Sequence, residues 1–365
     1  MLSDLTKRFL EYVSIDSESR SEGDFIRHLR SQLVKMGYEP AFYPASDGSD
    51  RGNLFLFLEG DKQTDPLLLM AHTDTVTPGR GIKPIVEKEY IHTDKTTILG
   101  GDDKAGVSIL MELLDRLASE KTAHRPLEIL FSYGEESGMN GARDAIAGSY
   151  IRSKKALVLD SMGTVGKIVR ASAGASRMRA TVFGKSAHTG NAISEGINAI
   201  QIAAGAISQL PLMEIDHITN ANVESISSYG DPGAVTAKCT FTVSVRSGSP
   251  KRLLELKEQM TQTVRKSADD FGGSADIFWE DDYPSFEVAK DDELLVEVMR
   301  AYEDAGVAAD PVYSGGASDA NILNDGGIRA LNLGNGTLKV HTTDENLHIR
   351  SFELLYGIVY SMVTK

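Results

Sequence analysis

The chain has 365 residues, of which 41% are hydrophobic and 25% are charged. This length exceeds the roughly 250–300 residues at which a single hydrophobic core stops growing, so we expect two domains. Lys and Arg number 38 and Asp and Glu number 52, a net charge of −14 that disfavours binding to nucleic acids or anionic membranes.

The first part of the chain, up to about residue 170, alternates short apolar runs with amphipathic patterns. Strands are expected at Leu54–Leu58, Leu67–Met70, Leu127–Phe131 and Ala156–Leu159, and helices at Asp4–Tyr12, Asp24–Met36, Lys104–Ala118 and Gly138–Ala147. Continuous apolar strands are typical of a largely parallel sheet that helices cover on both faces. The N-terminus lacks the apolar core of a signal peptide, and no run of about 18 apolar residues follows, so we expect a cytoplasmic protein.

The middle of the chain, from about Ala171 to Asp282, has the alternation of half-exposed strands instead. Strands are expected at Ser176–Phe183, Asn222–Ser228, Val235–Val245 and Ala275–Trp279, and helices at Ser194–Leu210 and Pro250–Phe271. This βαββαβ order is typical of a small α+β domain with its helices on one face of the sheet.

After Asp282 the first pattern returns. It predicts a helix at Asp291–Ala305, a glycine-rich segment at Ser314–Asp319, a strand at Ile328–Leu333 and a helix at Ser351–Val363. We therefore expect an α/β domain formed by residues 1–171 and 283–365, interrupted by an inserted domain at 172–282.

Several candidate metal ligands lie at the ends of predicted strands. His72 and Asp74 follow the strand Leu67–Met70, and in an extended chain they share a face. A metal-bound imidazole requires such a neighbouring carboxylate to hold its tautomer, although a polar strand end would explain the pair equally well. With Cys239 as the only cysteine, a thiolate zinc site is excluded.

Two adjacent acids, Asp102 and Asp103, begin the helix Lys104–Ala118. Taken alone they are explained as a helix cap and a first-turn acid, worth roughly 1 kcal/mol. The functional alternative is a carboxylate whose two oxygens bridge a pair of cations.

Further acids and a histidine complete the set. Glu135 and Glu136 follow the strand Leu127–Phe131, Asp160 follows the next strand, and His341 lies in a polar stretch before the last helix. In open α/β sheets, ligands bind at the carboxyl ends of the strands. Imidazole and oxygen donors without thiolates suit zinc, manganese or cobalt at a catalytic site.

The inserted domain and the glycine-rich segment add candidate substrate contacts. His188 lies between a strand and a helix, and Arg246 ends an alternating strand, where its guanidinium could bind a carboxylate through two hydrogen bonds. Solvated surface residues are the alternative for both. The turn at residues 315–321 can approach a ligand closely, or be an ordinary loop, and offers Gly316, Ser318, Asp319 and Asn321.

Other catalytic motifs are absent from the sequence. A phosphate-binding loop would need glycine where Arg179 stands, and neither a Gly-x-Gly-x-x-Gly fingerprint after a strand nor a Gly-x-Ser-x-Gly elbow occurs. These absences argue against a nucleotide-binding oxidoreductase and against a serine hydrolase.

Taken in order, the motifs resemble those of M20 metallopeptidases, and in particular the peptidase T-like branch. The matching segments are His72-Thr-Asp74, Gly101-Asp-Asp-Lys-Ala-Gly106, Gly134-Glu-Glu136, Asp160, Ser186-Ala-His-Thr-Gly190, Gly315-Gly-Ala-Ser-Asp319 and His341. The resemblance covers essentially the whole chain. It implies a zinc-peptidase-like catalytic domain with a mostly parallel central sheet, interrupted by a lid domain through which such proteins often form homodimers.

The resemblance also implies a centre of two divalent metal ions, most commonly Zn²⁺, with Co²⁺ or Mn²⁺ as alternatives. Asp102 would bridge the two ions and precede a cis peptide bond to Asp103. His72 and Asp160 would complete the ligands of one ion, and Glu136 and His341 those of the other.

The remaining roles follow from the same resemblance. Glu135 would be the general base, Asp74 would orient His72, His188 would help to polarise the scissile carbonyl, and Arg246 would hold the terminal carboxylate of the substrate. The expected activity is that of an aminopeptidase on tripeptides or similar short peptides. An amidohydrolase acting on N-acylated amino acids is the alternative, and a non-catalytic metal-binding protein is a distant one.

Overall fold

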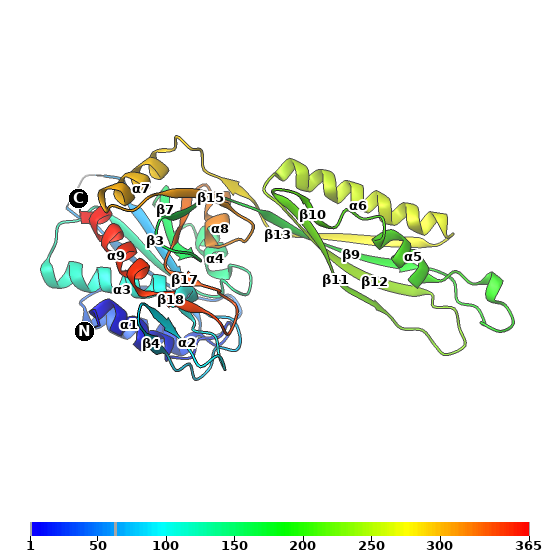
Figure 1. The fold of residues 1–365 in the computed structure, drawn as a ribbon, viewed down its shortest axis with the longest axis horizontal. Coiled ribbons are helices and arrows are strands. Elements are labelled where there is room, and N and C mark those ends of the chain that lie inside the picture. The colour runs from blue at the N-terminus through cyan, green and yellow to red at the C-terminus, as the bar shows by residue number, and fades with distance from the viewer. Residues whose placement is uncertain (1, 62–63, 365) are drawn as a thin grey trace. The chain divides into compact units, whose positions relative to one another are not determined.

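The computed structural model describes residues 2–61 and 64–364, which form two compact units (Figure 1). The first unit contains the described residues up to Arg170, the segment Glu287–Tyr313, and the described residues from Ser318 onward. The second contains Ala171–Phe286 and the short segment Ser314–Ala317. Of these residues, 171, 283–286 and 314–317 were expected in the other domain. Among the helices of the described part, none has both the length and the apolar character that crossing a membrane requires.

The first unit is built on a mixed sheet whose centre is parallel. In the described residues this sheet has nine strands in the order β1-β2-β6-β3-β7-β16-β8-β14, with β15 pairing with β8. Their bounds are β1 Ala41–Pro44, β2 Gly52–Leu58, β3 Leu67–His72, β6 Leu127–Ser132, β7 Lys155–Ser161, β8 Lys167–Ser172, β14 Phe286–Glu287, β15 Asp310–Ser314 and β16 Arg329–Gly334. Strands β6, β3, β7 and β16 are parallel, whereas β1, β2 and β8 pair antiparallel.

Helices cover both faces of this sheet, and every residue of β3 and β6 is buried as a result. Helices α1, α3 and α9 pack against one another, α3 also contacts β3 and β7, and α4 packs on α8 (Figure 1). The helices of the unit are α1 Asp4–Val13, α2 Gly23–Lys35, α3 Gly101–Glu120, α4 Asn140–Gly148, α7 Glu293–Asp304, α8 Asp319–Asp325 and α9 Ile349–Thr364. These findings confirm the α/β fold class.

Helix α8 follows the glycine-rich segment directly, at a place where the sequence predicted no helix. Its start is fixed by a capping box, in which Ser318 Oγ accepts the N–H of Ala320 and Asn321 Oδ1 accepts the N–H of Ser318. Such reciprocal bonds satisfy amide groups that a helix leaves free at its N-terminus. The glycines before Ser318 masked this signal.

A second, smaller sheet in the same unit carries the polar stretch around His341. Its order is β17-β18-β5-β4, with bounds β4 Ile85–Glu87, β5 Tyr90–His92, β17 Thr337–Leu338 and β18 Asn346–His348. The loop between β17 and β18 contains His341, whose φ of 61° is in the left-handed region. Short strands of this kind gave no clear alternation in the sequence, and we did not predict them.

The second unit is an antiparallel sheet with two helices packed together on it. Its described strands follow the order β10-β11-β12-β9-β13, with bounds β9 Gly174–Phe183, β10 Met213–Asp216, β11 Thr219–Ser228, β12 Lys238–Ser247 and β13 Ser274–Tyr283. The helices are α5 Ala199–Ile207 and α6 Pro250–Asp270. Alternate residues of β9 and β12, such as Met178 and Val243, form its core with the helices.

Two details of this unit differ from the prediction. Strand β10 is additional to the expected βαββαβ order. The helix expected at Ser194–Leu210 begins only at Ala199, after a 3₁₀ turn at Ile193–Glu195. The chain is extended between these elements because the backbone of Ile197 pairs with that of Lys185.

Candidate metal centre

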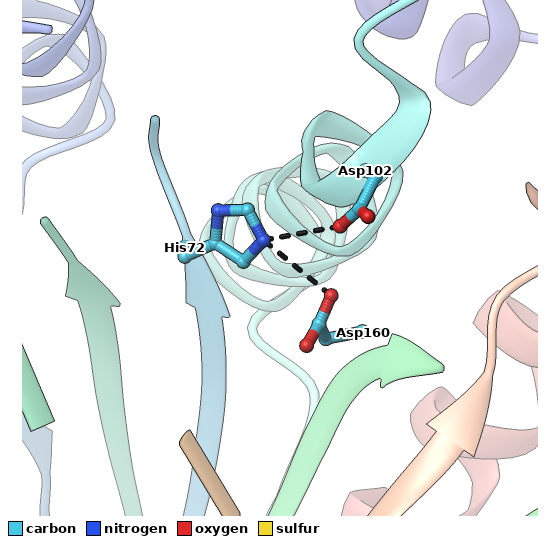
Figure 2. Close-up of side chains that lie close together, drawn as sticks. All are labelled: His72, Asp102 and Asp160. Carbon is cyan, nitrogen blue, oxygen red and sulfur yellow. Dashed lines mark hydrogen bonds and ion pairs between the residues drawn. The ribbon is translucent and has the colours of Figure 1, made fainter. Parts of the chain in front are cut away.

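The first cluster of potential ligands surrounds His72, the last residue of β3 (Figure 2). Its Nε2 lies 3.1 Å from Asp102 Oδ1, near the start of α3, and 3.4 Å from Asp160 Oδ1 on β7. The ring is fully buried, and burial alone would lower the pKa of His72, yet its bonds to Asp102, Asp160 and Asp74 raise it well above the usual value. One ligand atom from each residue lies within 4.8 Å of the others.

The second cluster is formed by Asp102, Glu136 and His341. His341 Nε2 lies 2.8 Å from Glu136 Oε1 and 3.3 Å from Asp102 Oδ2. Asp102 therefore directs Oδ1 to one imidazole, His72, and Oδ2 to the other, His341. A carboxylate with each oxygen in a different cluster has the arrangement that a bridging ligand requires.

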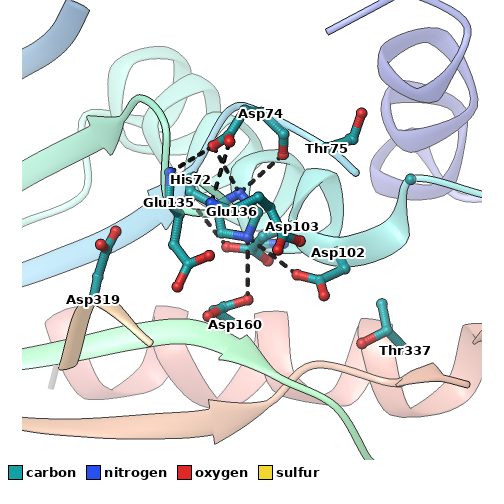
Figure 3. A network of polar contacts seen from close by, with 12 residues as sticks. His72, Asp74, Thr75, Asp102, Asp103, Glu135, Glu136, Asp160, Asp319 and Thr337 are labelled. Atoms are coloured by element: carbon teal, nitrogen blue, oxygen red, sulfur yellow. Dashed lines mark hydrogen bonds and ion pairs between the residues drawn. The ribbon is translucent and has the colours of Figure 1, made fainter. Parts of the chain in front are cut away.

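Asp74 contacts a residue of each cluster, His72 of the first and Glu136 of the second (Figure 3). His72 Nδ1 lies 2.9 Å from the main-chain oxygen of Asp74 and 3.4 Å from its Oδ1. The same carboxylate accepts the N–H groups of Glu135, at 2.9 Å, and Glu136, at 3.2 Å, and the hydroxyl of Ser19 at 2.6 Å. The structure thus gives Asp74 a second task, holding the Glu135–Glu136 segment, which sequence reasoning did not foresee.

The two acids at the start of α3 have separate environments. The peptide bond between Asp102 and Asp103 is cis. Asp103 is buried, where its Oδ1 accepts the N–H of Gly106 at 3.0 Å and its Oδ2 accepts that of His72 at 3.2 Å. The capping alternative therefore describes Asp103, while Asp102 faces the two imidazoles.

Glu345 is a buried residue of this region that sequence reasoning missed. Its Oε2 accepts the N–H groups of Leu99 and Gly100, both at 2.8 Å, and its Oε1 accepts that of Asp102 at 3.0 Å. Burial and the charge of Asp102 raise the pKa of Glu345 to about 7. No sequence signal could have identified it, because its partners are main-chain groups more than 240 residues away.

The acids of the centre outnumber its imidazoles, and burial makes their charges interact strongly. Burial and the charge of Asp102 raise the pKa of Asp160 to about 8. Burial also raises the pKa of Glu135 well above its usual value, and the charge of Asp160 adds to this. Hydrogen bonds to Asp102 and Glu136 raise the pKa of His341 to about 10. Divalent cations would offset this negative charge, and imidazole with carboxylate oxygens is a donor set that fits them.

Asp319 lies beside this group of acids, near Glu135 (Figure 3). Its Oδ2 accepts the hydroxyl of Ser132 at 2.7 Å, and its buried Oδ1 has no hydrogen-bond partner in the described part of the chain. Burial raises the pKa of Asp319 to about 6. Ser318 and Asn321 are buried, and both side chains take part in the cap of α8. Their expected substrate contacts stay predictions.

The other expected substrate contacts belong to the second unit. His188 is exposed, and its Nδ1 accepts the N–H groups of Gly190 and Asn191. Arg246 is an exposed residue of β12, and Gly316 lies in the exposed part of the segment Ser314–Ala317. The roles expected for these residues stay predictions.

Residues 68–365 match the family model described as peptidase family M20/M25/M40. The chain belongs to this family and is a metallopeptidase of its peptidase T-like branch. This result confirms the family expected from the motifs.

Relatives match along nearly the whole length. An uncharacterized protein of Bacillus subtilis, YqjE, is 37% identical over 361 residues, covering 98% of this chain and 97% of its own. A peptidase T of Shewanella pealeana is 26% identical and covers 96% of this chain and 95% of its own. The crystal structure of aminopeptidase PepT from Bacillus cereus has a TM-score of 0.92 at 33% identity, covering 99% of this chain and 97% of its own. That of a tripeptidase from Staphylococcus aureus has a TM-score of 0.93 at 31% identity, with the same coverage.

Proposed function

We propose that this metallopeptidase is a dinuclear aminopeptidase that hydrolyses the N-terminal amide bond of short peptides such as tripeptides. The observation that carries the proposal is Asp102, whose two carboxylate oxygens face His72 in one cluster and His341 in the other. The relatives called aminopeptidase PepT and tripeptidase, each more than 30% identical, support the choice of substrate.

The two ions would be held by residues that already converge. His72, Asp102 and Asp160 would hold one ion, and Asp102, Glu136 and His341 the other. Zn²⁺ suits imidazole and carboxylate donors best, with Co²⁺ and Mn²⁺ as alternatives. When bound, such ions lower the pKa of a coordinated water and polarise the scissile carbonyl.

Glu135 is the residue that we assign to proton transfer. We place it outside the two ligand sets, although its carboxylate forms a third group of potential ligands with His72 and Glu136, whose ligand atoms lie within 4.8 Å of one another. Asp74 holds its main-chain N–H, so the side chain extends from a fixed backbone. From this position Glu135 takes a proton from the attacking water and donates it to the leaving amine.

The second unit would supply the remaining substrate contacts. Arg246 would bind the terminal carboxylate of the peptide through paired hydrogen bonds, and His188 would donate to the carbonyl oxygen as it gains charge. Gly316 of this unit and Asp319 of the first unit would border the bound peptide. Exposure of His188 and Arg246 within their unit supports this assignment, because both side chains are accessible to a ligand.

We also propose a cytoplasmic homodimer that associates through the second unit. Strands β10 and β13 lie at the two ends of its sheet, and an unpaired strand edge can pair with a second copy of the chain. Phe278 on β13 is 65% exposed, which supports an apolar contact there. Light scattering at increasing protein concentration tests this, and a monomer at every concentration would contradict it.

The decisive experiment is a peptide screen with Zn²⁺- and Mn²⁺-loaded protein, in which released amine is measured. We expect cleavage of di- and tripeptides with a free N-terminus and no cleavage when that terminus is blocked. Preferential hydrolysis of N-acylated amino acids would instead identify an amidohydrolase. No cleavage of any amide by fully loaded protein would overturn the assignment.

A further inference from the structure

The loop that carries Asp102 is held by a carboxylate from the far end of the chain. Glu345 is 1% exposed, and its two oxygens accept three main-chain N–H groups, those of Leu99, Gly100 and Asp102. Each bond is between 2.8 and 3.0 Å long. These amides precede or begin α3, so the carboxylate fixes the backbone from which the Asp102 side chain extends.

Glu345 is also hydrogen-bonded to the segment that contains His341. The N–H of Glu345 donates to the main-chain oxygen of Thr342 at 3.0 Å, which closes a turn directly after His341. Glu345 therefore links the backbone of Asp102, the ligand shared by both clusters, to the turn that follows His341, a ligand of the second cluster only. His72 and Asp160, by contrast, are positioned by strands β3 and β7.

We propose that Glu345 is a positioning residue that holds Asp102 and His341 at the separation required by the second metal ion. This inference rests on the proposed dinuclear function. It predicts an asymmetric effect: disturbing Glu345 weakens the ion bound by Asp102, Glu136 and His341 more than the ion bound by His72, Asp102 and Asp160.

The test uses Glu345→Gln, which keeps the size of the side chain but places an amide NH₂ against main-chain N–H donors. Zn²⁺ is titrated into metal-free protein in competition with a chromogenic chelator, which reports stoichiometry and affinity. We expect the binding event that His341→Ala weakens to lose about 10- to 100-fold in affinity in Glu345→Gln as well, with the other binding event changed much less. His341→Ala, which removes a ligand of the second cluster only, provides the reference pattern.

Glu128→Gln is a matched control. Glu128 is also a fully buried glutamate whose oxygens accept main-chain N–H groups, those of Arg152 at 2.9 and 3.1 Å and Ser153 at 2.8 Å. These bonds lie at the start of β6, away from the ligands. We expect Glu128→Gln to lower the unfolding midpoint of metal-free protein while leaving both Zn²⁺ affinities unchanged.

The possible outcomes separate this inference from the proposed function. Two Zn²⁺ ions bound with unchanged affinity in Glu345→Gln would overturn the positioning role alone, whereas a wild-type chain that binds fewer than two ions would overturn the dinuclear proposal. If Glu345→Gln does not fold, Gly101→Ala replaces it, because an added Cβ would lie 3.2 Å from Glu345 Oε1 and 2.9 Å from Thr337. Unchanged affinities in a folded Gly101→Ala protein would equally overturn the inference.

Discussion

Asp74 accepts the main-chain N–H of Glu135 at 2.9 Å, across 61 residues of sequence. Its own backbone and carboxylate also lie against His72 Nδ1, so one buried acid fixes an imidazole and the segment that carries the assigned base. Orientation of the Glu135–Glu136 segment therefore depends on Asp74 remaining an acceptor at both carboxylate oxygens, whereas His72 Nδ1 lies nearer to the main-chain oxygen of Asp74 than to its Oδ1.

The substitution Asp74→Asn tests this dependence. An amide NH₂ would face the N–H of Glu135 or Glu136 or the hydroxyl of Ser19, and at least one bond would be lost. We expect about a 10- to 100-fold loss of metal affinity or activity, typical of groups that orient metal ligands. Metal content and kcat, measured together, check the prediction. A variant with wild-type values of both would show that the orientation is set elsewhere.

The substitution Glu135→Ala separates proton transfer from metal binding. Glu135 is in neither proposed ligand set, so both ions should remain bound. Loss of a positioned base typically lowers the rate by about 10²- to 10⁴-fold, and we expect kcat to fall by that amount. Metal analysis of the purified variant is the control. Near-normal turnover would remove Glu135 from this role.

The substitution Arg246→Ala tests recognition of the C-terminal carboxylate. We expect KM for peptides with a free C-terminus to rise and kcat to change little, since the guanidinium would bind substrate and transition state alike. Peptides with an amidated C-terminus are the control, because they lack the charge that Arg246 would pair with. Equal losses for free and amidated peptides would contradict the clamp.

Much of the site could be predicted because its ligands follow strands with clear apolar patterns. Parallel strands bring their carboxyl ends to one edge, so His72 and Asp160 had to lie near each other once β3 and β7 were identified as neighbours. Glu345 could not be found in this way, since its partners are main-chain amides that leave no trace in residue identity.

The misjudged elements have similarly local causes. The sequence from Ser194 onward has helical periodicity, yet the backbone pairing of Ile197 with Lys185 keeps the chain extended until Ala199. Tertiary pairing of this kind overrides propensity. At α8, the reciprocal cap between Ser318 and Asn321 began a helix immediately after a glycine-rich turn.

We expect Glu22 to make the stability of the first unit depend on pH. Its side chain is fully buried, and neither carboxylate oxygen has a well-directed hydrogen bond in the described structure, the nearest cation being Arg51 Nη1 at 3.7 Å. Burial, and then the charge of Asp74, raise the pKa of Glu22 to about 7 from its usual value of 4.5. The folded chain holds the proton of the Glu22 carboxyl more tightly than the unfolded chain does. The stability that this protonated carboxyl contributes is therefore fully present below pH 4.5 and is lost as pH rises through 7.

The substitution Glu22→Gln removes this titration while keeping a neutral side chain of the same size. Relative to wild type, the variant should gain on the order of 2 kcal/mol in unfolding free energy between pH 5 and pH 8. Urea unfolding of both metal-free proteins at the two pH values measures this difference, and exposed Glu59→Gln is the control that should show none. A constant difference between variant and wild type at both pH values would mean that Glu22 is already ionised at pH 5, stabilised by Arg51.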